Sequence, residues 1–210
     1  MSIIESLKWR SAIKQFDPEK KVSAEDLTAL LEAADLAPTS GGFQTFKVIA
    51  ISNDQLKSEL LQASYGQKQV VDCSHILVFA YETNIGEQTV LDYIKLAAET
   101  RNHPESELDG YRDSMFGFIN SMDQTARNTW GRSQTYIALG MVMAAAAALK
   151  IDSCPMEGLD PVAYQKLLGL EDKNLMPVAI LPIGYRSEED YYSKLPKVRK
   201  GRENLVIEFN

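Results

Sequence analysis

The stretch HILVFAY, residues 75–81, is the part of the chain that decides the fold. Its apolar residues follow one another almost without interruption. A strand with one face in water would alternate polar and apolar side chains, so a continuous run predicts a short strand that is buried. The fold must therefore contain a covered sheet with this strand inside it.

Two further apolar runs predict strands that join this one. The first, Phe46–Ile51 (FKVIAI), precedes it, and the second, Met176–Ile183 (MPVAILPI), lies near the end of the chain. The segment Leu205–Phe209 is a candidate for a fourth strand, and the short segment Ile151–Cys154 leads into Pro155. These runs are few and short, which predicts a small sheet.

Helices are predicted around these strands from capping signals and from the helical spacing of apolar residues. Ser2 and Glu5 form a capping box for a helix over Ile3–Trp9. Ser23 opens a second helix, which Pro38 should end. Further helices are expected at Asp54–Ala63, twice within Glu87–Met122, at Gln134–Lys150 and after Pro161. Helices outnumber strands, so we expect an α+β fold with one domain over residues 1–210 and a small central sheet flanked by helices.

Size and composition favour an ordinary globular protein. The chain has 210 residues, of which 45% are hydrophobic and 24% charged. Its net charge of −7 argues against bulk binding to nucleic acid or to an anionic membrane. The start resembles no signal peptide, and the longest apolar stretch, Ile137–Leu149, is shorter than a membrane span. Two cysteines, Cys73 and Cys154, form no disulfide framework, so we expect a cytoplasmic protein with reduced thiols.

Positive charge nevertheless gathers at both ends of this acidic chain. The head carries Lys8, Arg10 and Lys14, and the tail carries Lys194, Lys197, Arg199, Lys200 and Arg202. Cations concentrated against the overall sign favour local recognition of an anion such as a phosphate.

Several common kinds of site are not indicated by the sequence. It has neither the GxGxxG nor the GxxxxGK[ST] nucleotide-binding pattern, and it has no GxSxG hydrolase motif. Cys73 and His75 are two residues apart, but two ligands without convincing partners make a poor zinc site. We therefore predict no metal site, and we interpret His75 as a structural residue.

Four short polar segments, in their order along the chain, carry a resemblance. They are Arg10–Asp17 (RSAIKQFD), Ala37–Ser40 (APTS) followed by Gln44, Pro155–Gly158 (PMEG) and Leu195–Arg199 (LPKVR). With these segments the chain resembles the FMN-dependent nitroreductase and flavin reductase family over essentially its whole length. The resemblance implies an α+β fold with a small mixed sheet, and an intertwined homodimer with two flavin sites at the subunit interface.

The resemblance also implies roles for individual residues. Arg10, Lys197 and Arg199 would hold the FMN phosphate, and Lys14 would lie near the N1 and O2 edge of the flavin. The backbone N–H groups of Glu157 and Gly158 would reach flavin N5 and O4. The full set of expected cofactor-binding residues is Arg10, Ser11, Ala12, Lys14, Thr39, Ser40, Gln44, Gln67, Gln69, Pro155, Met156, Glu157, Gly158, Lys197 and Arg199.

Some of these positions have particular expectations attached. Thr39, Ser40 and Gln44 would come from the partner subunit. Ala12 stands where the family often has a serine, and Gln67 or Gln69 would supply an amide near the ribityl chain and pyrimidine edge. Phe116 falls where the family places an aromatic residue over the active site, although it can equally be a core phenylalanine on a helix.

The implied chemistry belongs to the cofactor rather than to a catalytic triad. NADH or NADPH would pass hydride to flavin N5, and a nitroaromatic, a quinone or free flavin would then take the electrons in a ping-pong cycle. The same fold with another flavin task, such as flavin cleavage or reductive dehalogenation, is an alternative. A non-enzymatic module that binds an anion is a second alternative.

Overall fold

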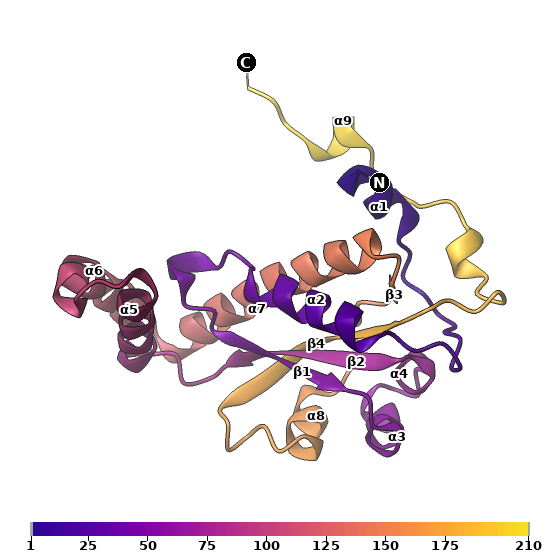
Figure 1. Ribbon diagram of the computed structural model, residues 1–210, viewed down its shortest axis with the longest axis horizontal. Coiled ribbons are helices and arrows are strands. Elements are labelled where there is room, and N and C mark those ends of the chain that lie inside the picture. Colours follow the sequence, from indigo (N-terminus) through magenta and orange to yellow (C-terminus); the bar gives the residue numbers. More distant parts are fainter. Residues whose placement is uncertain (1, 210) are drawn as a thin grey trace.

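The computed structural model describes residues 2–209 and contains one four-stranded sheet in the order β1-β2-β4-β3 (Figure 1). The strands are β1 (Phe46–Ile51), β2 (His75–Glu82), β3 (Asp152–Ser153) and β4 (Leu175–Gly184). All three strand pairs are antiparallel. The mixed character expected of the sheet is limited to one isolated parallel bridge, between Ala12 and Ser153. The α+β fold class is confirmed.

Helices cover the sheet and extend beyond it. They are α1 (Ile3–Trp9), α2 (Ala24–Asp35), α3 (Asp54–Ala63), α4 (Gln69–Asp72), α5 (Glu87–Arg101), α6 (Asp109–Asn120), α7 (Gln124–Ala148), α8 (Pro161–Leu167) and α9 (Arg202–Leu205). In Figure 1, α2 and α7 lie on one face of the sheet, and α3 and α8 lie on the other. The α5 and α6 helices form a pair that projects away from the sheet.

Strand β2 shows why the continuous apolar run forms a central strand. Leu77 and Phe79 pack in the apolar cluster that also contains residues of α2 and α7. Ile76 and Val78 pack in the cluster on the opposite face, which contains Leu60 of α3. Successive side chains of a strand point to opposite faces, so both faces need apolar residues when helices cover both. The predicted buried strand is confirmed.

Two elements differ from their predictions. The long helix begins at Gln124 rather than at Gln134, because Asp123 caps it by accepting from the Ala126 N–H at 2.8 Å. Its first turns are polar, so apolar periodicity did not reveal them. The strand predicted at Leu205–Phe209 does not form, since Leu205 ends α9 and the chain after it has no strand partner among residues 2–209.

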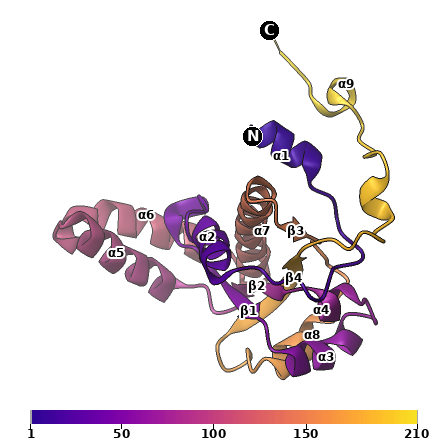
Figure 2. The same cartoon turned by 45° about the vertical axis from the view of Figure 1, so that its right-hand side comes forward.

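The helices α1 and α9, near the two ends of the described chain, lie close to each other at the top of the view and away from the sheet (Figure 2). Two cations lie over the ring of Trp9, the last residue of α1, and hold α1 against the rest of the chain. The Lys150 ammonium lies 4.3 Å and the Arg186 guanidinium 4.7 Å from its ring centroid. No helix within residues 2–209 has the length and apolar character needed to cross a membrane.

Candidate functional site

The head and the tail of the chain together form a cavity of about 330 Å³. Six residues expected to bind the cofactor line it, although their positions in the sequence are far apart. The lining residues are Arg10, Ser11, Ala12, Lys14, Tyr192, Leu195, Pro196, Lys197 and Arg199. The two basic ends predicted from charge alone are therefore one site, which we call the head–tail cavity.

The cations of the head–tail cavity have no internal counter-ion. None of the ion pairs formed within residues 2–209 involves Arg10, Lys14, Lys197 or Arg199. Burial and then repulsion from Arg199 lower the pKa of Arg10. Burial and then repulsion from Arg10 and Arg199 likewise lower the pKa of Lys197. These cations destabilise one another, which a bound anion would reverse.

The Arg10 side chain also carries a buried donor that an anion could satisfy. Its Nε atom is buried and has no hydrogen-bond partner among the described residues. A buried donor without an acceptor costs on the order of 1–3 kcal/mol, so such donors are rare in native structures. An acceptor placed at this atom would remove that cost, and the chemistry of the donors fits a phosphate or a carboxylate.

Lys14 connects the head–tail cavity to the turn at Pro155–Gly158. Its ammonium Nζ lies 3.7 Å from Sγ of Cys154, the residue just before this turn. Burial raises the pKa of Cys154, so its thiol is neutral and leaves the charge of Lys14 uncompensated. Lys14 is therefore a cation that lines the same cavity as Arg10 and Arg199 and also lies beside the residue that precedes the turn.

The turn itself is fastened on three sides. Met156 exchanges backbone hydrogen bonds of 2.9 Å with Ile180 of β4. The Gln67 side-chain amide donates to the Gly158 carbonyl at 2.8 Å, and the Tyr136 hydroxyl donates to the Glu157 carboxylate at 2.7 Å. Within residues 2–209 the backbone N–H groups of Glu157 and Gly158 have no acceptor. Two free donors on an anchored turn can bind an acceptor edge of a ligand.

The close contact between Gly158 and the Gln67 side chain requires a glycine at position 158. A Cβ at position 158 would lie 2.6 Å from Nε2 of Gln67, so only glycine allows this contact. The same Nε2 also donates to the Ser64 carbonyl at 3.0 Å. The side-chain amide N–H groups of Gln67 thus hold the turn, and the expected contact of Gln67 with the cofactor remains a prediction. Gln69 is the buried first residue of α4, two positions further along.

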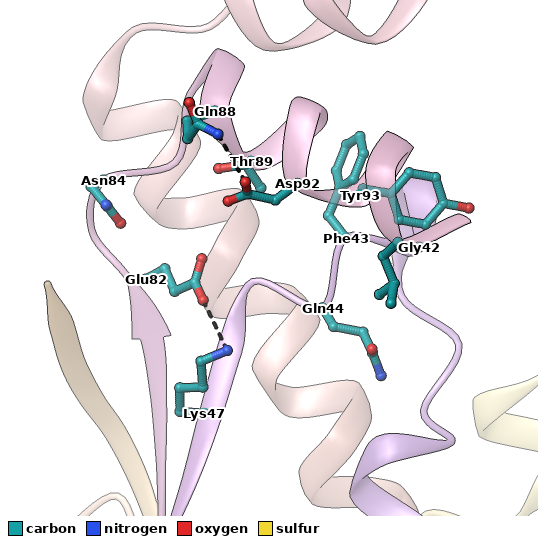
Figure 3. Close-up of a pocket in the computed structure, with 11 residues that line it drawn as sticks. Gly42, Phe43, Gln44, Lys47, Glu82, Asn84, Gln88, Thr89, Asp92 and Tyr93 are labelled. Atoms are coloured by element: carbon teal, nitrogen blue, oxygen red, sulfur yellow. Dashed lines mark hydrogen bonds and ion pairs between the residues drawn. The ribbon is translucent and has the colours of Figure 1, made fainter. Parts of the chain in front are cut away.

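The segment Thr39–Gln44 is not part of the head–tail cavity of its own chain. Its backbone is fixed by a bond from the Gln44 N–H to Thr39 Oγ1, at 3.1 Å, and by one from the Ser40 N–H to Gln134 Oε1, at 2.8 Å. Gln44 lines a separate cavity of about 270 Å³ beside the Lys47–Glu82 ion pair and α5 (Figure 3). One chain therefore supplies only part of the expected cofactor-binding set to any one place.

Phe116 lies in α6, where it is half-buried and packs against the apolar cluster of α5 and α6. That cluster contains Ile85, Val90, Ile94 and Ile119. The surroundings of Phe116 are those of a core phenylalanine on a helix. A contact with a substrate remains a prediction.

The sequence patterns did not single out two residues that the structure places at the site. Tyr192 lines the head–tail cavity. Asp190 is fully buried, and its carboxylate accepts backbone N–H groups from both the head and the tail. The only signal in the sequence was Ser193 three residues after Asp190, which indicates a turn but no function.

Comparison of the sequence with known proteins supports the resemblance to the nitroreductase family. The model of the nitroreductase family matches residues 7–185. A protein of Staphylococcus haemolyticus named as an NAD(P)H nitroreductase is 33% identical, over 98% of this chain and 96% of its own length. The major NAD(P)H-flavin oxidoreductase of Aliivibrio fischeri is 34% identical, over 97% of both chains.

Solved structures share the fold at lower identity. A nitroreductase structure from Bacillus subtilis superposes with a TM-score of 0.87 at 23% identity, covering 99% of this chain and 98% of its own. One from Exiguobacterium sibiricum, solved in complex with FMN, also gives 0.87 at 23% identity, covering 100% and 98%. Because the family model spans most of the chain and the relatives exceed 30% identity over nearly its whole length, the chain belongs to the nitroreductase family.

Proposed function

We propose that the protein is an FMN-dependent oxidoreductase that takes electrons from NADH or NADPH, with residues 1–210 acting as one FMN-binding domain. The observation that carries this proposal is the head–tail cavity, where clustered cations have no counter-ion and the buried Arg10 Nε has no acceptor. The relative named as an NAD(P)H-flavin oxidoreductase and the structural neighbour solved with FMN support the same cofactor.

The residues of the cavity fit the phosphate end of FMN. A phosphate monoester carries nearly two negative charges and several acceptor oxygens, and guanidinium groups offer forked donors to such a group. Arg10, Lys197 and Arg199 would hold this phosphate, and Ser11 and Ala12 would form the wall beside it. The mutual repulsion of the three cations would then become attraction toward one dianion.

The ring of the cofactor would lie toward the Pro155–Gly158 turn. Lys14 would place its ammonium near the N1 and O2 edge, where it favours negative charge. The free N–H groups of Glu157 and Gly158 would donate to the N5 and O4 edge. When bound, FMN supplies hydride exchange at N5, first with the nicotinamide and then with a nitroaromatic, a quinone or free flavin in a ping-pong cycle. The chain itself then only binds, orients and polarises.

A second copy of the chain would complete the site. Thr39, Ser40 and Gln44 lie away from the head–tail cavity of their own chain, so they would serve the cavity of a partner in a homodimer. Exposed apolar side chains on α1, on α7 and in the tail support such an interface. They include Ile3, Ile4, Ile137, Met141, Val198, Leu205, Ile207 and Phe209. The two cysteines are free thiols, which supports a cytoplasmic location for the enzyme.

Anaerobic titration of the purified protein tests the proposal. We expect a yellow protein with flavin absorbance that is lost on addition of NADH or NADPH and restored by an acceptor. A panel of nitroaromatics, quinones and free flavins under both nicotinamides would then rank the acceptors. Protein that does not bind added FMN contradicts the proposal, and protein that binds FMN but is reduced by neither nicotinamide favours another flavin task.

A further inference from the structure

We infer that Asp190 is a positioning residue for the FMN phosphate site, because it joins the two separate pieces of chain that carry the phosphate-binding cations. The inference rests on the proposed function. The backbone also joins head and tail, from Ser187 N–H to the Gln15 carbonyl at 3.0 Å and from Asp17 N–H to the Tyr185 carbonyl at 2.8 Å. The inference assigns to the Asp190 carboxylate the part of this preorganisation that lies nearest the cations, and among the described residues this carboxylate forms no ion pair with a cation side chain.

The geometry of Asp190 is that of a clasp between head and tail. Its Oδ1 accepts the backbone N–H of Lys14 at 2.8 Å and that of Gln15 at 3.0 Å. Its Oδ2 accepts the backbone N–H of Ser193 at 2.8 Å, and Ser193 Oγ donates back to the Asp190 carbonyl at 3.0 Å. The carboxylate thus binds the head at Lys14 and Gln15, a few residues after Arg10, and the tail at Ser193, a few residues before Lys197.

The burial of Asp190 shows that this contact is built into the fold. The residue is 0% exposed, and a buried carboxylate is costly unless hydrogen bonds compensate it. Here three backbone N–H groups supply that compensation. A single oxygen could not accept from both segments at these two positions, so the arrangement calls for a carboxylate rather than a hydroxyl.

The cations explain why a clasp is needed. The head presents Arg10 and Lys14, and the tail presents Lys197 and Arg199, all with like charge around one cavity. Without a bound anion these groups repel one another, which would push the exposed tail away from the head. The clasp holds the cavity closed before the anion arrives, so that less ordering remains to be done on binding.

Flavin binding by matched variants tests this role in the full-length protein. Asp190→Ala removes the clasp, and Asp190→Asn keeps one acceptor oxygen. Asp160→Ala is the control, because Asp160 also accepts two backbone N–H groups, from Val162 at 3.0 Å and Ala163 at 3.1 Å, but does so at the start of α8. The dissociation constants of FMN and of riboflavin, which lacks the phosphate, are measured by quenching of flavin fluorescence.

We expect Asp190→Ala to weaken FMN binding by about tenfold or more and riboflavin binding by less than about threefold. Asp190→Asn should fall between Asp190→Ala and wild type, and Asp160→Ala should match wild type. Unchanged FMN affinity in Asp190→Ala overturns the inference, and so does an equal loss for both flavins, which would indicate a general structural role. If Asp190→Ala does not fold, Asp190→Asn is judged by the same two criteria. Wild-type protein that binds neither flavin contradicts the proposed function itself, and the inference falls with it.

Discussion

At the scale of single residues, Arg10 and Arg199 carry like charges whose mutual repulsion a bound anion would relieve. Arg10 is only partly exposed, and its pKa is lowered by burial and by Arg199. Arg199 is exposed, and among the described residues its guanidinium donates only to the neighbouring Val198 carbonyl, at 2.7 Å. Within residues 2–209 neither guanidinium forms an ion pair, which supports the proposed role of both in binding an anion.

Replacing Arg199 separates this binding role from folding. We expect Arg199→Ala to weaken FMN binding by about 10- to 100-fold, since hydrogen bonds to a charged group are worth about 1.5–3 kcal/mol. Stability should change little, because the side chain is exposed. Lys200→Ala is the matched control, as Lys200 is the next tail cation but does not line the cavity. Equal FMN dissociation constants for the two variants in equilibrium titration would contradict the phosphate assignment.

Asp190 gives a prediction for the dependence of stability on pH. Burial alone would raise the pKa of Asp190, but hydrogen bonds from Lys14, Ser193 and Gln15 outweigh it and lower the pKa below its ordinary value. A lowered folded-state pKa adds stability above the unfolded value of about 4, and this stability is lost as the pH falls through the folded-state value.

The wild-type protein should therefore exceed Asp190→Asn in free energy of unfolding at neutral pH, and the difference should shrink from about pH 4 downward. Urea unfolding of both proteins at a series of pH values measures this directly. A difference that stays constant to pH 2 would show that the Asp190 carboxylate gains nothing from its charged form in the folded state.

At the scale of elements, the sequence predicted what local chemistry determines. The bounds of α1, β1 and α3 were predicted without error, because each has a clear cap or an uninterrupted apolar pattern. The early turns of α7 were missed, since their residues are polar and only the Asp123 cap marks them. The strand predicted at Leu205–Phe209 does not form in this chain. A strand needs a neighbouring strand to pair with, and the local sequence pattern does not show whether there is one.

Lys57 holds several elements together, and no sequence pattern revealed this role. It sits in α3 with a side chain only 1% exposed. Its ammonium donates to the carbonyls of Cys73, at 2.8 Å, and Val71, at 3.2 Å, and pairs with Asp54 at 2.8 Å. One buried cation therefore ties α3 to the end of α4 and the start of β2.

We expect Lys57→Met to destabilise the protein by about 3 kcal/mol, because the buried Cys73 carbonyl and the part-buried Val71 carbonyl lose their donor and the Asp54 carboxylate loses its partner. Lys47→Met is the matched control, since Lys47 pairs with Glu82 at 3.4 Å but is 62% exposed. The control should cost less than about 1 kcal/mol. Urea unfolding at one fixed protein concentration compares them, and similar losses in both variants would refute the structural role of Lys57.

At the scale of the whole molecule, the charge pattern predicted half of the candidate site. The basic ends indicated that an anion is recognised, the family resemblance assigned Arg10, Lys197 and Arg199 to one phosphate, and the structure brings these three and Lys14 to one cavity. Composition could not reveal Asp190, whose role depends on contacts between segments far apart in the sequence. The role expected of Thr39–Gln44 could not be tested in a single chain, since this segment does not line the head–tail cavity and its residues Gly42–Gln44 line another cavity.

Because Thr39–Gln44 lie away from the head–tail cavity of their own chain, we predict that the protein is a homodimer. The tail exposes Ile207 and Phe209 at 83% and 95%, although both are large apolar residues. Apolar side chains gathered on an open segment mark an interface, and burying one such side chain contributes about 1.5–3 kcal/mol. Light scattering on the eluting protein should therefore give twice the chain mass of 23.4 kDa.

A charge in the tail should weaken the dimer and the flavin site together. We expect Ile207→Asp and Phe209→Asp each to raise the dimer dissociation constant by about tenfold or more, because the carboxylate would have to enter an apolar interface. FMN affinity should then depend on protein concentration, since the two subunits of the proposed homodimer would share each site. Val162→Asp is the control, as Val162 is 65% exposed on α8 across the sheet from the tail (Figure 1). A wild-type monomer that binds FMN with undiminished affinity at every concentration would show that one chain completes the site alone.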